Sequence, residues 1–244
     1  MARWRRRRPP RCPPGWSTGP PNFVGIGAQR AGTTWWHSLL AEHPQVHGPR
    51  VKEMHFFGHE AVDLDPAELA REYALHFPRP PGAIAGEWTP YYMQGRNVPR
   101  QLRVAAPDAR ILVLLRDPVD RYRSGAFRRP DKSENATRRG LYATQLARYL
   151  EVFPRRQLLV LQYERCLEAP AVELARTFEF LDVEPGFVPK SFERRGARSF
   201  GAGKTLPPEV RERLTRLYEP EVRGLAELGV EVDLSLWPNF SHLA

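Results

Sequence analysis

The sequence has little cysteine, little lysine and no long apolar run, and each shortage narrows the class of protein. Two cysteines, Cys12 and Cys166, are too few for a disulfide framework, so we expect a reducing, cytoplasmic setting. No apolar segment approaches the about 18–20 residues that a membrane-spanning helix requires, so we expect no membrane span. Residues 1–21 are rich in arginine and proline without the apolar segment of a signal peptide, and we expect a disordered basic tail there.

The net charge of +9 at pH 7 indicates anionic partners without identifying nucleic acid as one of them. Only four of the 37 basic residues are lysine, and the arginine-rich tail has few aromatic side chains interleaved with it. We therefore expect an anionic small molecule and no nucleic acid. A nucleic-acid binder that uses the tail is the weaker alternative.

Histidine and acidic residues show no spacing that is typical of a metal site. His43 and His47 are four apart but have Pro44 between them, and His55 and His59 have no further ligand types close by in the sequence. We therefore predict that no metal is bound.

Short apolar segments alternate with helical patterns, which predicts an α/β fold with a mainly parallel sheet flanked by helices. The chain length of 244 residues suits a single domain, which we assign to residues 22–244. The predicted strands are 23–26, 83–88, 110–115 and 157–161, and segment 51–57 is expected to be extended. The predicted helices are 33–42, 65–77, 98–106, 119–127, 141–153, 170–181 and 207–228, and long loops are expected over 128–139 and 185–205.

The first predicted strand is joined to the first helix by a glycine-containing loop. Gly27 and Gly32 bracket this loop and allow backbone conformations that are strained for other residues. The two threonines that follow Gly32 stand where the helix begins, so free backbone N–H groups and the helix dipole favour a phosphate or sulfate there. Arg30 adds a permanent positive charge. The segment therefore predicts an anion-binding loop.

The loop differs from the nucleoside-triphosphate motif G-x-x-x-x-G-K-[ST] at one decisive position. Gly27, Gly32 and Thr34 match, but Thr33 occupies the place of the lysine that contacts the β- and γ-phosphates. A triphosphate is therefore disfavoured. An ATP-dependent small-molecule kinase is the alternative function, and it would need an acidic magnesium ligand, for which Asp117 is the candidate.

Two motifs resemble those of sulfotransferases that use 3′-phosphoadenosine 5′-phosphosulfate (PAPS). Gly-Ala-Gln-Arg-Ala-Gly-Thr-Thr-Trp, residues 27–35, resembles the 5′-phosphosulfate loop of this family. Arg-Asp-Pro-Val-Asp-Arg-Tyr-Arg-Ser follows a predicted buried strand and resembles the 3′-phosphate motif, whose matching residues are Arg116 and Ser124. The resemblance extends over about residues 22–240. It implies a single α/β domain with a P-loop-like loop, and metal-free sulfuryl transfer from PAPS to a hydroxyl of a carbohydrate or small molecule.

Segment 52–57, Lys-Glu-Met-His-Phe-Phe, resembles the Glu-x-His-Phe-Phe of heparan-sulfate-type sulfotransferases. Transfer to an alcohol needs a base near the acceptor hydroxyl. The resemblance implies that Glu53 is this base, and His55 is the alternative because other sulfotransferases use histidine. Arg30 stands where the family usually has lysine. Because arginine stays protonated, we expect it to act by its charge alone.

Segment 86–91, Gly-Glu-Trp-Thr-Pro-Tyr, resembles the Glu-Lys-Thr-Pro-x-Tyr of carbohydrate sulfotransferases, with Trp88 in place of the lysine. This departure disfavours an anionic polysaccharide as acceptor and favours an aromatic or less charged one. Trp35 matches an adenine-stacking position but also suits the core, and Lys204 matches a residue that closes over the nucleotide. The acceptor and the oligomeric state stay open. The predicted donor site is Gly27, Gln29, Arg30, Ala31, Gly32, Thr33, Thr34, Trp35, Arg116, Ser124 and Lys204, and the predicted acceptor contacts are His55, Trp88, Tyr91 and Tyr92.

Overall fold

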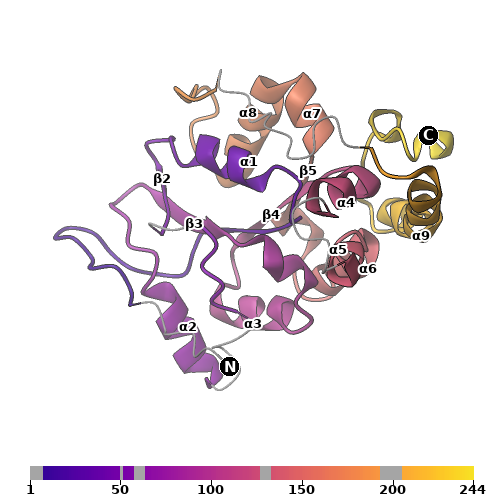
Figure 1. Cartoon of the computed structure of the whole chain (residues 1–244). Coiled ribbons are helices and arrows are strands. Elements are labelled where there is room, and N and C mark those ends of the chain that lie inside the picture. Colours follow the sequence, from indigo (N-terminus) through magenta and orange to yellow (C-terminus); the bar gives the residue numbers. More distant parts are fainter. Residues whose placement is uncertain (1–7, 50–51, 58–63, 127–132, 193–204) are drawn as a thin grey trace.

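The computed structural model describes residues 8–49, 52–57, 64–126, 133–192 and 205–244 (Figure 1). In these residues a five-stranded sheet has the order β2-β3-β1-β4-β5, and every neighbouring pair is parallel. Four strands agree with the sequence prediction, whereas the two-residue β2 was not predicted. The strands are β1 (Phe23–Gly27), β2 (Val46–His47), β3 (Ile84–Trp88), β4 (Arg110–Leu115) and β5 (Leu158–Gln162).

The helices agree with the predicted pattern except at two places. A loop was predicted over 128–139, but residues 133–138 form a helix, and the buried Arg121 side chain contacts its Ala136 carbonyl. A short helix also follows β5 directly. The α-helices are α1 (Thr33–Leu40), α2 (Pro66–Ala74), α3 (Val98–Ala105), α4 (Pro118–Ala126), α5 (Ser133–Arg138), α6 (Tyr142–Leu150), α7 (Tyr163–Glu168), α8 (Pro170–Leu181) and α9 (Pro208–Glu227). Short 3-10 helices are η2 (Pro90–Gln94), η4 (Arg155–Gln157), η5 (Leu234–Leu236) and η6 (Ser241–Leu243).

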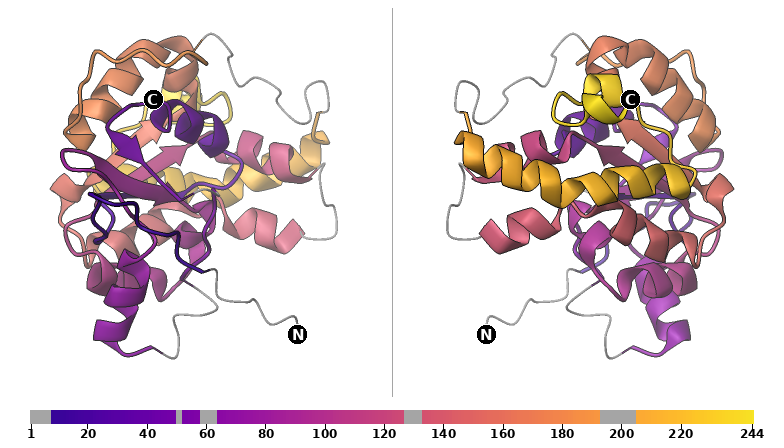
Figure 2. Two further views of the ribbon diagram at one scale, coloured as in Figure 1. Left: turned by 90° about the vertical axis from the view of Figure 1, so that its left-hand side faces the viewer. Right: turned by 90° about the vertical axis from the view of Figure 1, so that its right-hand side faces the viewer.

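Helices cover both faces of the sheet. Helices α1, α7 and α8 lie on one side and α2 and α3 on the other, while α4, α5, α6 and α9 gather together (Figure 1). Figure 2 shows the 20-residue helix α9 extending along the molecule, where it packs against α4 and α6. Because the sheet is covered on both faces, the apolar residues of β4 are fully buried. For the same reason, the sequence of β4 does not alternate between apolar and polar residues.

The strand order places β1 at the point where the chain changes direction across the sheet. From β1 the chain continues to β2 and β3 on one side, and it then crosses to β4 and β5 on the other side. The carboxyl ends of parallel strands lie at one edge, and ligands of open α/β sheets bind at such a switch point. The residues that directly follow β1, β3, β4 and β5 therefore belong to one region of the molecule. These are the loop 28–32, Thr89, Arg116 and Tyr163.

The described part of the predicted tail, residues 8–21, contacts the domain. Ser17 and Arg79 form an antiparallel bridge whose two N–H···O distances are 3.0 and 2.9 Å. The Trp16 ring meets the edge of His47, with ring centroids 5.0 Å apart, and the Arg79 guanidinium donates to the Gly19 carbonyl. Residues 16–19 therefore make regular contacts although the sequence predicted disorder over 1–21.

Candidate active site

The anion-binding loop turns sharply after β1. Its first residue, Ala28, donates its N–H to the Leu114 carbonyl at 2.8 Å, which holds the loop against β4. Arg30 and Gly32 have φ angles of 71° and 91°, in the left-handed region. A Cβ atom at Gly32 would lie 2.6 Å from the Tyr163 ring. Position 32 therefore needs glycine both for its backbone conformation and for space.

The amino terminus of α1 is open to an anion. No side chain of the described residues caps this terminus, and its first turn contains no acidic residue. The first N–H groups of a helix have no acceptor within the helix, and they carry the positive end of its dipole. Thr33 is 4% exposed, whereas Thr34 is exposed at the surface. The local structure thus has the donors that a phosphate or sulfate requires.

Arg116 directly follows β4 and lies against Tyr163. The centre of its guanidinium is 4.7 Å from the centroid of the Tyr163 ring, and the Tyr142 hydroxyl donates to the Arg116 carbonyl at 2.9 Å. The side chain is buried, and its Nε finds no hydrogen-bond partner among the described residues. Tyr163 was not predicted from the sequence. Tyr163 directly follows β5, just as Arg116 directly follows β4. This position after a buried strand is the sequence signal that could have identified Tyr163 as a site residue.

The two predicted anion-binding elements meet through a direct contact. Arg30 in the loop donates from Nη2 to the Ser124 carbonyl at 3.0 Å and lies 3.3 Å from the Ser124 hydroxyl. Ser124 is on α4, eight residues after Arg116, and is 7% exposed. The structure therefore brings together residues 27–34 with Arg116 and Ser124 at the same edge of the sheet.

Two further arginines that the sequence analysis missed contribute positive charge here. Arg121 is fully buried, and its Nε and Nη1 have no hydrogen-bond partner within the described chain. Burial lowers the pKa of Arg139, and the charges of Arg121 and Arg30 lower it further. The charges of Arg30, Arg121 and Arg139 act on one another, and a nearby anion would offset this mutual repulsion. The residues present therefore fit a ligand that carries several negative charges.

Asp117, the candidate magnesium ligand of the kinase alternative, has a structural role. One carboxylate oxygen accepts from the N–H groups of Val119 and Asp120 at the start of α4, and the other accepts from Asn239. Burial raises the pKa of Asp117. Across the described ranges, no group of three His, Cys, Asp or Glu residues is arranged to hold a metal ion.

Glu53 and His55, the two candidate bases, interact with each other. The segment is irregular and not extended as predicted, because both residues have left-handed φ angles, 67° and 53°. The Glu53 carboxylate lies 3.4 Å from Nε2 of His55 and 3.1 Å from Nζ of Lys52. The interaction with His55 and the charge of Lys52 lower the pKa of Glu53 to about 2, against the opposing effect of burial. Glu53 is therefore ionised at neutral pH, but its low pKa makes it a weak proton acceptor while Lys52 and His55 remain its partners.

A buried carboxylate lies beneath this segment. Glu87 on β3 accepts hydrogen bonds from the hydroxyls of Tyr73, Thr89 and Tyr92 at 2.7, 2.5 and 3.0 Å. Burial raises the pKa of Glu87, and these bonds oppose the shift. Because all three hydroxyls donate to the same carboxylate, the network fixes the positions of the Tyr73, Thr89 and Tyr92 side chains.

The Glu87 network holds the segment of the candidate bases in position. The Phe56 N–H donates to the Tyr92 hydroxyl at 2.9 Å, and the His55 N–H donates to the Thr89 hydroxyl at 3.4 Å. The backbone at His55 and Phe56 is thereby tied to Thr89, which directly follows β3, and to Tyr92 on η2. The sequence analysis did not predict this role for Glu87.

Two of the predicted acceptor contacts are in the core, which corrects the sequence prediction. Trp88 is 0% exposed, its indole N–H donates to the Gly27 carbonyl at 3.3 Å, and its ring fills the space beside Gly25. Tyr92 is also 0% exposed and belongs to the Glu87 network. Neither side chain presents a surface to an acceptor. Tyr91 is partly exposed, and its ring centroid is 6.1 Å from that of His55.

Two predicted donor-site residues differ from the rest of the group. Trp35 is 9% exposed and makes edge contacts with Trp36 and Tyr163, so its position favours the core over adenine stacking. Lys204 lies outside the described residues. Gln29 and Arg30 are partly exposed at the loop, and Gln29 accepts from the Gln94 side chain at 3.2 Å.

A sequence model of the sulfotransferase domain matches residues 20–195, which include every motif described above. The chain belongs to the sulfotransferase family. It is 30% identical over 243 residues to human heparan sulfate glucosamine 3-O-sulfotransferase 3B1, covering 82% of this chain and 61% of that protein. It is 33% identical over 105 residues to the membrane-associated sulfotransferase kil1 of Dictyostelium discoideum, covering 41% of this chain and 21% of that protein. The chain spans about three fifths of the length of the heparan sulfate 3-O-sulfotransferases that it matches.

Solved structures agree with this family. A sulfotransferase from Alicyclobacillus acidocaldarius superimposes with a TM-score of 0.70 at 28% identity, covering 89% of this chain and 98% of that one. The sulfotransferase domain from the curacin biosynthetic pathway shares the fold, with a TM-score of 0.57 at 13% identity over 89% of this chain and 100% of that domain. The predicted fold class is thus confirmed. Within the described part of this sulfotransferase, no helix combines the length and apolar character needed to cross a bilayer.

Proposed function

We propose that this sulfotransferase is PAPS-dependent and transfers a sulfuryl group to a hydroxyl of a carbohydrate or small-molecule acceptor. The observation that carries the proposal is the contact between Arg30 and Ser124, which unites the loop 27–34 with Arg116 at one edge of the sheet. A nucleotide with an anionic group at each end needs two such elements side by side. Arg116, Arg121 and Arg139, whose buried Nε atoms have no hydrogen-bond partner among the residues that the structure describes, support a multiply charged anion there.

The residues that would hold the donor divide into two groups. The backbone N–H groups of 29–34 and the hydroxyls of Thr33 and Thr34 would hold the 5′-phosphosulfate, because they lie at the open terminus of α1. Arg116 and Ser124 would hold the 3′-phosphate. Lys204 is proposed to add a positive charge from a part of the chain that the structure does not describe.

The proposed chemistry uses one base and one permanent charge. Bound PAPS supplies the sulfuryl group and the adenosine 3′,5′-bisphosphate that departs. Glu53 would take the proton from the acceptor hydroxyl, and the positive charge of Arg30 would stabilise negative charge on the departing side. An acceptor hydroxyl that replaces Lys52 or His55 beside the carboxylate would raise its proton affinity, because both neighbours stabilise its ionised form.

The nature of the acceptor is proposed from the relatives and from the exposed candidate contacts. The human relatives are named for transfer to a hydroxyl of heparan sulfate glucosamine. His55 and Tyr91 are the predicted acceptor contacts that are not buried in the core. Cys12 and Cys166, both within the described residues, are free thiols, which fits the cytoplasmic location that we propose.

Binding without metal tests the proposal. In buffer with a chelator, titration calorimetry should show binding of adenosine 3′,5′-bisphosphate and none of ATP. Arg116→Ala should weaken the bisphosphate by about tenfold or more, because a charge-assisted contact to phosphate is worth about 1.5–3 kcal/mol. Arg156→Ala, an exposed arginine on η4, is the control and should change nothing. Tight binding of ATP with magnesium, or an unaffected Arg116→Ala variant, would contradict the assignment.

A further inference from the structure

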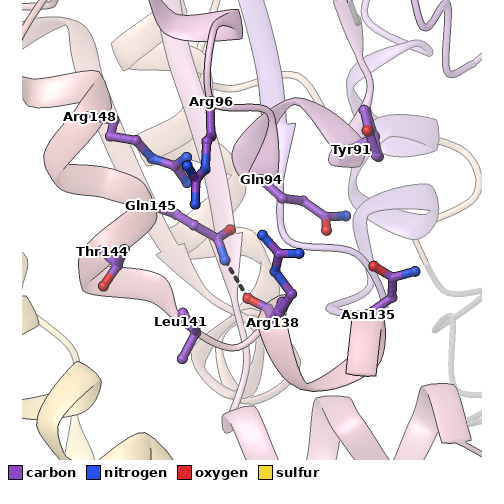
Figure 3. A pocket seen from close by; sticks show the side chains of 9 residues that line it. All are labelled: Tyr91, Gln94, Arg96, Asn135, Arg138, Leu141, Thr144, Gln145 and Arg148. Atoms are coloured by element: carbon purple, nitrogen blue, oxygen red, sulfur yellow. Dashed lines mark hydrogen bonds between the residues drawn. The ribbon is translucent and has the colours of Figure 1, made fainter. Parts of the chain in front are cut away.

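A basic pocket opens beside the candidate active site. It has a volume of about 480 Å³ and lies between η2, α5 and α6 (Figure 3). Its lining includes three arginines and three side-chain amides, and in Figure 3 most of these side chains point toward a common centre. The residues that matter to the argument are Tyr91, Gln94, Arg96, Arg138, Gln145 and Arg148. The sequence analysis assigned none of the three arginines to a site.

The charge of this pocket is not neutralised within its lining. None of the described lining residues is acidic, and Arg96, Arg138 and Arg148 form no ion pair with any other described residue. Burial lowers the pKa of Arg148, and the neighbouring charges of Arg96 and Arg138 lower it further. Nε of Arg148 is buried and has no hydrogen-bond partner among the described residues.

Two acidic side chains stand nearby, and neither occupies the pocket. Glu151 is exposed, lies one turn after Arg148 on the chain and partly offsets the lowering of that arginine's pKa. Glu221 on α9 accepts from the N–H and the hydroxyl of Thr144, so its carboxylate is already bound at the start of α6. The arginines therefore remain available to an external anion.

The pocket adjoins the proposed site of transfer on two sides. Gln94, from its lining, donates to the Gln29 side chain of the anion-binding loop at 3.2 Å. Tyr91, also from its lining, faces His55 with ring centroids 6.1 Å apart. Arg139, next in the chain to Arg138, is close enough to both Tyr91 and Arg30 for their charges to interact. A molecule with one group at His55 and Glu53 could thus place another group among the arginines.

We propose that this pocket is an acceptor subsite that binds a sulfate or carboxylate group carried by an acidic saccharide. The inference rests on the proposed function, because it concerns the acceptor of that reaction. Guanidinium groups match the planar and tetrahedral oxyanions of such groups, while amides and an aromatic face suit sugar hydroxyls and rings. It reverses the expectation drawn from Trp88: the missing lysine does not leave the acceptor region uncharged, because Arg96, which lies just after η2, and arginines on α5 and α6 supply the charge.

The test compares two matched double variants of the full chain. Arg96→Gln with Arg148→Gln removes two charges from the pocket. Arg156→Gln with Arg213→Gln removes the same charge from exposed positions on η4 and α9. Titration calorimetry with adenosine 3′,5′-bisphosphate present measures a heparin-derived tetrasaccharide, its fully desulfated form and neutral maltotetraose. The desulfated form keeps only the carboxylates and so distinguishes the two kinds of anionic group.

The pocket variant should bind the heparin tetrasaccharide about tenfold or more weakly, from the usual strength of charge-assisted hydrogen bonds. Its affinities for the bisphosphate and for maltotetraose should be unchanged, and the control variant should match the wild type. In turnover, KM for the acidic acceptor should rise while kcat is kept. Arg96→Gln alone, at an exposed position, serves as the test if the double variant does not fold.

Three results would overturn the subsite. The first is equal loss in the two double variants, which would indicate general charge attraction. The second is an unchanged pocket variant. The third is a wild-type protein that binds the bisphosphate but no acidic saccharide, which would leave the proposed function intact. A wild-type protein that does not bind the bisphosphate overturns the proposed function and this inference with it.

Discussion

At the scale of single residues, the site depends on three neighbours in sequence. The Glu53 carboxylate lies between two donors, Lys52 and His55. Glu53 and His55 have left-handed backbone, which turns their side chains toward each other. The pKa of Glu53 is lowered to about 2, so this carboxylate does not titrate between pH 5 and 9. A pH dependence of kcat/KM in that range therefore reports another group of the free protein, whereas kcat reports the pKa that Glu53 has with an acceptor hydroxyl beside it.

Glu53→Gln tests the role of the carboxylate. We expect kcat to fall by about 10²–10⁴-fold, the usual contribution of a general base, because the amide cannot accept the proton. The affinity for adenosine 3′,5′-bisphosphate should be unchanged, since Glu53 is not among the proposed donor contacts. Steady-state kinetics and calorimetry measure the two quantities. Glu209→Gln, at an exposed position on α9, is the control, and an active Glu53→Gln variant would assign the base to His55.

At the scale of elements, the anion-binding loop is shaped by its contact with the residue after β5. Gly32 ends the loop with φ of 91° directly against the Tyr163 ring, and the same ring supports Arg116. The loop, β4 and β5 are therefore coupled through one aromatic side chain. A change at Gly32 should be felt both at the loop and at Arg116.

Gly32→Ala should weaken adenosine 3′,5′-bisphosphate by roughly tenfold. The alanine is strained by about 1–2 kcal/mol at positive φ, and its Cβ forces Tyr163 to move. Gly82→Ala is the matched control, because Gly82 also has positive φ, of 76°, but has open space around its added Cβ. The control should lose stability in thermal melts without losing nucleotide affinity. Equal nucleotide affinity in the two variants would show that the Tyr163 contact does not shape the loop.

At the scale of the whole molecule, segments from distant parts of the chain complete the structure. Residues 16–19 pack against Arg79 and His47, and α9 near the other end contacts α4 and α6. None of these contacts involves a residue of the loop 27–34. Stability and nucleotide binding should therefore respond differently to changes in the first residues.

Removal of residues 1–20 should lower Tm, because it deletes the Ser17–Arg79 bridge and the contact of Trp16 with His47. We expect a loss of a few kcal/mol at most, from two backbone hydrogen bonds and one aromatic contact. Bisphosphate affinity should be kept. A shorter truncation of residues 1–10 retains both contacts and is the control. Lost nucleotide binding in the longer truncation would show that this segment contributes to the site.

The sequence by itself determined the features that depend on neighbours along the chain. Apolar segments and helical patterns predicted four of the strands and most of the helices, since these depend on local periodicity. The loop 27–34 and Arg116 with Ser124 were recognisable because each motif is contiguous, and the parallel sheet then brings them to one edge.

Only the tertiary structure decided which side chains face the core and which distant residues meet. Trp88 and Tyr92 were predicted to contact the acceptor, yet both are buried. The packing of β3 against β1 buries Trp88, and Tyr92 on η2 is buried beside Glu87 and Phe57, which no local stretch of sequence reveals. Arg96 precedes Arg138 by 42 residues, Arg148 follows Arg138 by ten, and the three carry no shared pattern. Their convergence depends on how η2, α5 and α6 pack, and packing arises from long-range contacts that no local stretch of sequence contains.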